Sequence, residues 1–543
     1  MGETGAGRVS AAIRPEFSTV QHSGDQAQVT VPRVYNAAVD LVDRHLVEGR
    51  GDKCAVIDDR GATTYRELAA RVNRAGNMLL AMGLRPEDRI VMVMQDSVDF
   101  PALFLGAIKA GIVPIPVNTL LTTADYAYIL ADSRARAVAV SASLWPVVRG
   151  ATGGQERLAH VLVQGGVPDD ADGAEDFDRL LAAADDELQP AATVSDEPAF
   201  WLYSSGSTGR PKGAVHIQSS LVQTAVLFGR NVLNLTESDV VFSAAKLFFA
   251  YGLGNGMTFP FQAGATAVLM AERPTPDSVM ARLKTHQPTV FYGVPTLYAG
   301  LLADPSLDRS KGSDRLRICV SAGEALPRDI GERWRQRFGA DILDGIGSTE
   351  MLHIFLSNRE GDLRYGTTGK PVPGYRVKLT AEDGSPVPAG EVGDLWVSGP
   401  SSAMCYWNNR EKSHDTFQGP WTRTGDKYAV DADGFFTYQG RSDDMLKVSG
   451  IWVSPFEVES TLAAHEAVVE AAVVGRADND DLIKPEAFVL LADRYTGDAA
   501  LEADLKEFVK AHLAPYKYPR WINFVDELPK TATGKTQRFK LRQ

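Results

Sequence analysis

Two periodicities of hydrophobic residues alternate along the first half of the chain. Residues 65–84 repeat apolar side chains at helical spacing and stop at Gly83, which predicts an amphipathic helix. The run RIVMVMQ at 89–95 is almost continuously apolar and predicts a buried strand. Residues 99–118 predict another helix, a glycine stop and another strand. This alternation, from Val34 to about Ala151 and again from Ala199 to about Asp344, predicts parallel sheets covered by helices.

The pattern changes after about Gly366. Short β-type runs (YRVKLT, GDLWVSG, GFFTYQG) separated by Gly, Pro and Asp predict a smaller β-rich subdomain. The last hundred residues mix strand-like runs (AVVEAAVVG, EAFVLLA) with helix-like runs (SPFEVESTLAAH), and we place a domain boundary at 440–444. The predicted fold is α/β. Residues 31–440 form a large N-terminal domain with two βα-type parallel-rich sheets and the β-rich subdomain, and 441–543 form a small α+β C-terminal domain.

Three segments depart from these patterns. Residues 1–30 contain no apolar periodicity and are predicted to be a disordered polar tail. Residues 167–197 hold eleven Asp or Glu against one Arg, which indicates a solvated surface connection with one short helix. Residues 247–270 carry no charge and are long enough to span a bilayer, but four glycines and Pro260 interrupt them. We expect these residues to form buried core and pocket lining.

Composition narrows the class of protein. A hydrophobic fraction of 44% and a charged fraction of 23% are typical of a soluble globular chain and argue against disorder. The net charge of −13 disfavours a general nucleic-acid or anionic-membrane binder. The three cysteines are widely spaced, with no CxxC pair, so we expect neither a disulfide scaffold nor structural zinc.

The densest chemical signal is WLYSSGSTGRPKGAVH at residues 201–216. Small residues let backbone N–H groups approach an anion, while hydroxyls and the ammonium of Lys212 add donors, so this stretch suits a phosphate cradle. It is not a Walker A loop, because Lys212 follows Pro211 and precedes Gly213 rather than Ser or Thr. By composition alone, a turn is the commoner explanation of such a stretch.

Five ordered motifs make the reading more specific: YSSGSTGRPKG, GIGSTE at 345–350, TGD at 424–426, GRSDDMLKVSGIWVSPFEVE from Gly440, and PKTATGK at 529–535. Together they resemble the adenylate-forming superfamily of acyl-CoA synthetases, luciferases and peptide-synthetase adenylation domains. The resemblance covers the chain except its first thirty or so residues. It implies that a carboxylate attacks the α-phosphate of ATP to give an acyl-adenylate and pyrophosphate, and that a thiol then displaces AMP.

The resemblance also implies residue roles. Thr349 would contact the α-phosphate, Glu350 would bind Mg²⁺, and Lys535 would bridge the acid and the α-phosphate. The ATP-binding residues would be Ser204, Ser205, Gly206, Ser207, Thr208, Gly209 and Lys212 for the phosphates, Gly323, Glu324, Ala325, Asp344, Gly345 and Ile346 for adenine, and Asp426 and Arg441 for the ribose.

In this superfamily the C-terminal domain is mobile and rotates between the two half-reactions. The matched hinge is Asp443, and the CoA-binding residues would be Lys447, Ser449 and Gly450. Glycine at position 450 would let the pantetheine pass close to the backbone.

Two stretches, residues 245–260 and 345–358, resemble the aryl-CoA ligase branch and its benzoate-activating members. The acyl pocket implied by this resemblance comprises Phe249, Ala250, Tyr251, Gly323, Ile346, Leu352 and His353. Ring substituents stay open, because a methyl-sized change in an apolar pocket discriminates by only ~1–3 kcal/mol. The cosubstrates would be ATP with Mg²⁺ and CoA, in the cytoplasm. A carrier protein as acceptor, a luciferase-like oxygenase and a catalytically silent nucleotide-binding protein stay open, and the oligomeric state is not predicted.

Overall fold

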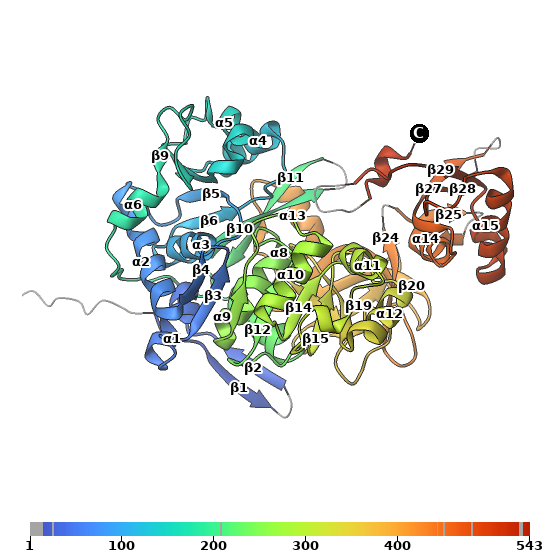
Figure 1. The fold of residues 1–543 in the computed structure, drawn as a ribbon, viewed down its shortest axis with the longest axis horizontal. Helices are drawn as coiled ribbons and strands as arrows, with labels where there is room; N and C mark the ends of the chain where they lie inside the picture. Colours follow the sequence, from blue (N-terminus) through green and yellow to red (C-terminus); the bar gives the residue numbers. More distant parts are fainter. Residues whose placement is uncertain are drawn as a thin grey trace, which may run out of the picture. The chain divides into compact units, whose positions relative to one another are not determined.

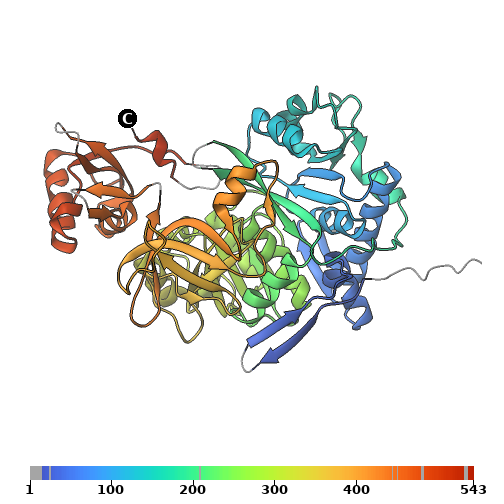
Figure 2. The same ribbon diagram turned by 180° about the vertical axis from the view of Figure 1, so that it is seen from behind.

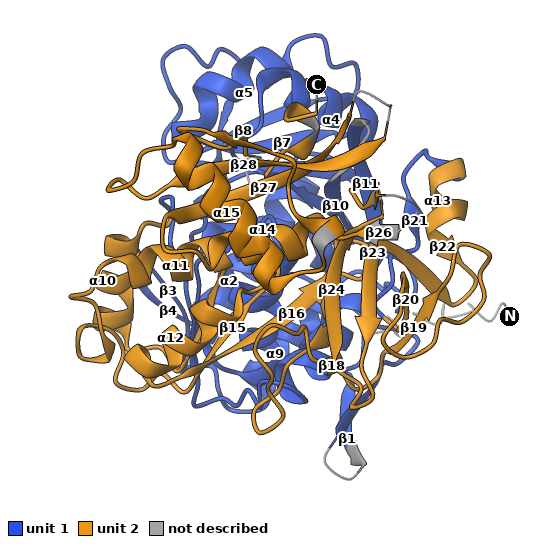
Figure 3. Ribbon diagram, turned by 90° about the vertical axis from the view of Figure 1, so that its right-hand side faces the viewer, with its two compact units in different colours: residues 1–273, 401–410 blue, residues 274–400, 411–543 orange. Residues whose placement is uncertain are grey.

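The computed structural model describes residues 15–23, 26–206, 209–442, 444–448, 451–478, 482–530 and 536–542. The chain divides into two compact units, which Figure 3 colours separately. The first comprises residues 1–273 and 401–410, and the second residues 274–400 and 411–543. The domain boundary predicted at 440–444 lies within the second unit and stays a prediction.

A five-stranded parallel sheet with the order β6-β5-β7-β8-β9 forms one layer of the first unit. One face packs against α4 and α5, and Figure 1 shows α2 and α3 on the opposite side. Because both faces are covered, β5 and β7 are buried along nearly their whole length, as their apolar sequences predict. The elements are β5 (Arg89–Val93), β6 (Val113–Pro116), β7 (Ala137–Ser141), β8 (His160–Gln164), β9 (Glu175–Asp176), α2 (Tyr65–Ala81), α3 (Asp99–Lys109), α4 (Thr123–Ser133), α5 (Trp145–Thr152) and α6 (Phe177–Ala183).

A second group of strands in this unit has the order β12-β13-β3-β4, in which β12, β13 and β3 are parallel. The uncharged run 247–270 supplies buried helices beside them, and the expectation of buried core is therefore confirmed. The elements are β3 (Cys54–Asp58), β4 (Gly61–Thr64), β12 (Val240–Ser243), β13 (Thr266–Val268), α1 (Arg44–Val47), α7 (Ser220–Thr224), α8 (Ala250–Leu253), α9 (Phe259–Ala263), and the π-helices η1 (Val39–Asp43), η3 (Ala225–Arg230) and η4 (Gly254–Thr258).

The disordered tail predicted for residues 1–30 is wrong for its second half. Strands β1 (Thr19–Ser23) and β2 (Gln26–Thr30) form an antiparallel hairpin, which projects from the unit in Figures 1 and 2. Strand β2 is short and most of its side chains are polar, so its hydrophobic pattern does not indicate a strand. Residues 1–14 lie outside the described residues.

The second unit begins with three parallel strands, β14, β15 and β16, followed by the antiparallel strands β17 and β18. A five-stranded antiparallel group, built on β19, β20, β23, β22 and β24, confirms the predicted β-rich subdomain. The elements are β14 (Val290–Gly293), β15 (Ile318–Ser321), β16 (Asp341–Gly347), β17 (Ile354–Ser357), β18 (Lys370–Pro371), β19 (Arg376–Thr380), β20 (Val392–Ser398), β22 (Phe417–Gln418), β23 (Trp421–Val430), β24 (Phe436–Arg441), α10 (Pro276–His286), α11 (Pro295–Ala303), α12 (Arg328–Phe338) and α13 (Arg410–Thr416).

The C-terminal part of this unit has a hydrophobic core of its own between Leu446 and Ile522. Helices α14 (Pro455–Ala463) and α15 (Ala499–His512) accompany the sheet β27-β28-β29, as the mixed sequence pattern predicts. The strands are β25 (Leu446–Val448), β26 (Ile451–Val453), β27 (Val468–Ala477), β28 (Ile483–Leu491) and β29 (Trp521–Phe524).

No helix in the described part of the chain is both long and apolar enough to cross a membrane.

Candidate active site

The serine- and glycine-rich signature forms an antiparallel hairpin rather than a strand followed by a loop. Strand β10 (Pro198–Gly206) pairs with β11 (Gly209–Ile217), and Ser204 lies opposite Lys212. Ser207 and Thr208 lie outside the described residues. The ammonium of Lys212 lies 4.7 Å from the ring centre of Tyr406, which belongs to β21 (Cys405–Tyr406) next to β11. This cation–π contact holds a positive charge on the hairpin.

Aromatic residues in and next to the hairpin stabilise it. Tyr203 donates a hydrogen bond of 2.6 Å to Asp132, and the indole N–H of Trp407 donates to the carbonyl of the same residue at 2.9 Å. The rings of Trp201 and Trp407 are 4.6 Å apart. Burial, together with the Asp132 carboxylate, raises the pKa of Tyr203 far above its usual range, so the phenol stays a donor. Sequence reasoning missed Asp132, because it lies about 70 residues from its partner.

The predicted acyl residues Phe249, Ala250 and Tyr251 lie together at the start of α8, where all three are half-buried. This helix continues directly into the π-helix η4 and then into α9. A π-segment inside a helix is uncommon and frequently marks a functional site. The long uncharged stretch therefore carries a local irregularity that its hydrophobic pattern did not reveal.

Two charged residues fix the segment that precedes α8. The Lys246 ammonium donates to the carbonyls of Met270 and Ala271, and to that of Glu272 at 2.7 Å. The backbone N–H of Leu247 lies 3.2 Å from a carboxylate oxygen of Asp96, which is only 4% exposed. Burial raises the pKa of Asp96 to about 6, although Lys246 acts in the opposite direction. Neither residue was singled out from the sequence, because no local motif marks them.

The predicted adenine residues follow two neighbouring parallel strands of the second unit. Ser321 at the end of β15 pairs with Asp344 in β16, which places 323–325 and 344–346 along the carboxyl ends of adjacent strands. Ligands of open α/β sheets bind at this edge. Gly323 and Glu324 are exposed, whereas Asp344 is 5% exposed and its pKa is raised well above the usual value by burial.

A tight turn after β16 presents Thr349 and Glu350, both half-buried. The N–H of Met351 donates to the hydroxyl of Ser348 at 3.2 Å, and the N–H of Leu352 donates to the carbonyl of Thr349 at 3.2 Å. Leu352 adopts a φ of 65°, which is uncommon for a branched residue and typical of functional sites. Leu352 and His353, both predicted to line the acyl pocket, are buried, with exposed fractions of 3% and 2%.

The predicted ribose residues face each other across two antiparallel strands. Asp426 on β23 is paired in register with Arg441 on β24, and their charged groups are 3.2 Å apart. Arg441 also donates to the carbonyl of Thr424 at 3.1 Å, and the N–H of Asp426 donates to the Thr424 hydroxyl at 3.1 Å. Asp426 is 6% exposed. A buried carboxylate fixed in this way is a preorganised acceptor for hydroxyl groups.

The remaining predicted residues cannot be placed. Asp443, Ser449, Gly450 and Lys535 lie outside the described residues, and Lys447 is described only as a backbone position in β25, paired with residue 452. The other predicted residues divide between the units: 204–212 and 249–251 belong to the first, and 323–353, 426 and 441 to the second.

Residues 43–407 match the AMP-binding enzyme family, and residues 457–535 match the AMP-binding enzyme C-terminal domain. The chain is 60% identical to a benzoate–CoA ligase of Thauera aromatica, over 97% of this chain and 99% of that protein. It is 52% identical to a 4-hydroxybenzoate–CoA/benzoate–CoA ligase of Rhodopseudomonas palustris, over 94% of each. Crystal structures of a benzoate CoA ligase from Burkholderia xenovorans LB400 match with a TM-score of 0.87 and 55% identity, over 94% of this chain and 100% of that one.

Proposed function

The chain belongs to the AMP-binding enzyme family, and from this premise we propose that it is an ATP-dependent aromatic acid–CoA ligase of the benzoate type. The observation that carries the proposal is the likeness to benzoate–CoA ligase along nearly the whole chain. The fold supports it, because the parallel-rich sheets and the small C-terminal core match those of a solved benzoate CoA ligase.

In the first half-reaction, a carboxylate oxygen of the acid forms a bond to the α-phosphorus of ATP, and the bond to the pyrophosphate oxygen breaks. We assign the β10–β11 hairpin and the Lys212 ammonium to the departing phosphates. We assign Thr349 to the α-phosphate and Asp426 with Arg441 to the ribose. A carboxylate has two acceptor oxygens, so Asp426, held in place by Arg441, suits recognition of a diol.

The donor set near Thr349 fits Mg²⁺, which prefers oxygen ligands and is usually held by one or two carboxylates together with substrate phosphates. Glu350 supplies such a carboxylate and follows Thr349 in the same turn, where both residues are half-buried. Mg²⁺ would offset the negative charge that develops on the phosphates. In the described part of the chain, no three His, Cys, Asp or Glu side chains gather into an all-protein metal site.

In the second half-reaction, the CoA sulfur attacks the acyl carbon and AMP leaves with the bonding electron pair. We assign CoA to Lys447, Ser449 and Gly450, the hinge to Asp443, and the charge-bridging role of the first step to Lys535. We assign the aromatic ring to Phe249, Ala250 and Tyr251 in the first unit and to Gly323, Ile346, Leu352 and His353 in the second. A reaction that consumes ATP and CoA favours the cytoplasm, with no nucleic-acid or membrane partner.

A substrate panel tests the proposal. Purified protein with ATP, Mg²⁺ and CoA receives benzoate, 2-aminobenzoate, 4-hydroxybenzoate, cinnamate or a fatty acid, and the release of AMP and thioester is followed. We expect benzoate to give the highest kcat/KM. A preference for long-chain acids would contradict the pocket assignment and leave the family intact.

The panel includes 4-hydroxybenzoate because one relative is named as a ligase for both 4-hydroxybenzoate and benzoate. Acid-dependent exchange of pyrophosphate into ATP without thioester formation would favour a carrier protein as acceptor. Complete absence of exchange with every acid would favour a silent nucleotide-binding protein.

A further inference from the structure

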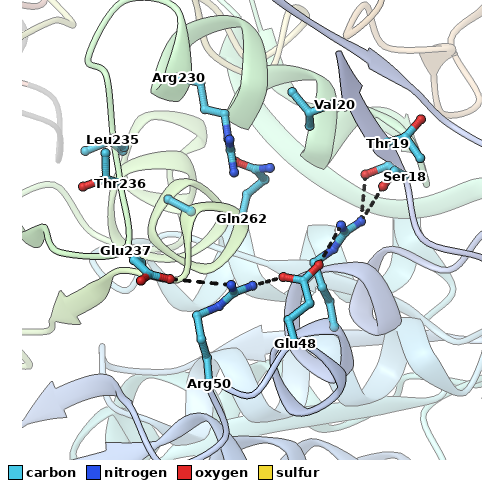
Figure 4. Close-up of a pocket in the computed structure, with 12 residues that line it drawn as sticks. Ser18, Thr19, Val20, Glu48, Arg50, Arg230, Leu235, Thr236, Glu237 and Gln262 are labelled. Atoms are coloured by element: carbon cyan, nitrogen blue, oxygen red, sulfur yellow. Dashed lines mark hydrogen bonds and ion pairs between the residues drawn. The ribbon is translucent and has the colours of Figure 1, made fainter. Parts of the chain in front are cut away.

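A polar pocket of about 530 Å³ lies in the first unit, and none of its lining residues belongs to the sets assigned above to ATP, acid or CoA. Four segments form it: β1 of the N-terminal hairpin with the residue before it, the region of α1, the last residue of η3 with the turn that follows, and the end of α9 (Figure 4). The hydrophobic pattern does not indicate this pocket, because it predicts a disordered polar tail where the hairpin forms one wall.

Three arginines line the pocket, and two of them are neutralised within the protein. Arg44 pairs with the buried Asp40 and donates to the carbonyl of Ser18 at 2.7 Å. Arg50 pairs with Glu48 and lies 3.6 Å from Glu237, so Figure 4 shows its guanidinium between two carboxylates. The two acidic residues of the lining are therefore already occupied by arginine.

The third arginine, Arg230, has no such counter-charge. Its Nε donates to the neutral amide oxygen of Gln262 at 2.9 Å, and no carboxylate of the described residues forms an ion pair with it. Its guanidinium is partly buried, and burial, followed by the positive charges of Arg44 and Arg50, lowers its pKa, although the Glu48 carboxylate acts in the opposite direction without forming an ion pair. The fold thus holds a desolvated cation beside two others, an arrangement that an incoming anion relieves.

We propose that this pocket binds a small phosphate-bearing molecule, with Arg230 as its principal counter-charge. A planar guanidinium with N–H groups left over matches two oxygens of a phosphate at once, which favours phosphate over a simple halide. The Thr19 hydroxyl and the Gln262 amide N–H groups line the same pocket and add donors. The volume exceeds that of inorganic phosphate and lies within the range of pockets that hold drug-sized ligands, so a phosphorylated metabolite fits.

Binding at this pocket should also order the N-terminal hairpin. The Asn231 side chain, next to Arg230, accepts from the N–H of Ala27 at 2.6 Å and donates to its carbonyl at 2.9 Å. The other strand of the hairpin contributes Thr19 and Val20 to the wall. A ligand bound to Arg230 would therefore lie against β1, while Asn231 anchors β2.

Isothermal titration of the full chain with sodium phosphate at low ionic strength tests the proposal. Arg230→Gln removes the cation and should weaken binding at least tenfold. Gln262→Glu keeps the arginine and gives it an internal carboxylate, so it should weaken binding similarly without loss of folding. Arg149→Gln, at an exposed arginine paired with Asp170 outside the pocket, is the matched control and should bind as the wild type does.

Hydrogen exchange supplies an independent measure, since phosphate should slow exchange of the β1 amides in the wild type and in Arg149→Gln only. Equal phosphate affinity in all four proteins, or no binding by the wild type, would overturn the proposal. Acetate bound through Arg230 as tightly as phosphate would refute the phosphate class. Because ligase turnover is not the readout, these outcomes do not depend on the proposed reaction.

Discussion

Gly425 lies between Thr424 and Asp426 in β23, at a position where a side chain would be strained and would displace the end of Arg441. Its φ of +77° is in the left-handed region, and an added Cβ would lie 2.8 Å from a guanidinium nitrogen of Arg441. The backbone conformation therefore favours glycine in the TGD motif, and a side chain here would push Arg441 away from Asp426.

Gly425→Ala should move Arg441 away from Asp426 and raise KM for ATP several-fold, while the left-handed strain costs about 1–2 kcal/mol of stability. Gly434→Ala is the matched control, because Gly434 has a φ of +83° with no atom within 4 Å of an added Cβ. It should lose similar stability with KM unchanged. The comparison needs KM for ATP and Tm of both variants, and an equal rise in KM in both would contradict the role given to Arg441.

The raised pKa of Asp96 predicts that the stability of the fold depends on pH. Its pKa is raised from 3.8 to about 6, so the folded chain holds this proton more tightly than the unfolded chain does. The contribution of Asp96 to stability therefore falls as pH rises from 3.8 to about 6, by on the order of 3 kcal/mol in total.

Asp96→Asn keeps an oxygen acceptor for the Leu247 N–H and cannot ionise. Thermal unfolding of both proteins between pH 4 and pH 7 should show the Tm of the variant rising relative to that of the wild type as pH increases. Parallel curves would show that the carboxyl does not titrate in this window.

At the scale of single residues, sequence motifs identified those residues that a local spacing pattern marks. The resemblance singled out Asp426 and Arg441, and the strand register brings them opposite each other, although their functional role is untested. It did not indicate Asp96, Lys246 or Asp132, because each acts on a partner far along the chain, 151 residues away for Asp96 and Leu247. Such pairings depend on tertiary packing and leave no periodic signal.

Among the elements, the helix that carries the predicted acyl residues packs unusually close to the chain before it. An added Cβ on Gly252 would lie 2.0 Å from the carbonyl oxygen of Lys246, the residue whose ammonium is fixed by three carbonyls. A side chain at position 252 would therefore push α8 away from the anchored segment.

Gly252→Ala should displace Phe249 to Tyr251 and raise KM for benzoate at least tenfold, with a lower Tm. Gly300→Ala in α11 is the control, because its added Cβ would make only an ordinary contact of 3.5 Å with Pro276. In a helix interior that replacement should stabilise by about 0.5–1 kcal/mol. Steady-state kinetics with benzoate measures this effect. An unchanged KM for benzoate in Gly252→Ala would contradict the assignment of the acyl pocket to α8.

Long periodic elements were predicted well, and short polar ones were not. Helices α2 and α3 and strand β5 follow their hydrophobic patterns, because core burial dictates both sequence and structure there. The β1–β2 hairpin buries little, and the glycines of β10 and β11 suggested a loop although the residues pair as strands. In both cases backbone hydrogen bonding, which sequence patterns do not report, determines the structure.

For the molecule as a whole, the proposed cycle separates two half-reactions that require different parts of the C-terminal region. Lys535→Ala should slow adenylate formation by at least the ~10²–10³-fold typical of one preorganised donor and affect thioester formation much less. Asp443→Pro should show the opposite bias, since proline restricts φ at the hinge. Pyrophosphate exchange measures the first step, and thioester formation from supplied benzoyl-adenylate measures the second. Equal loss of both steps in either variant would contradict its assigned role.

The three free cysteines are possible sites at which the reactive intermediate could acylate the protein. Cys319 is buried in β15, where burial raises its thiol pKa to about 12, and burial also raises the pKa of Cys54 and Cys405. Only the thiolate is a good nucleophile. An enzyme that forms a mixed anhydride can acylate its own thiolates, and here the raised pKa of each cysteine thiol disfavours that side reaction.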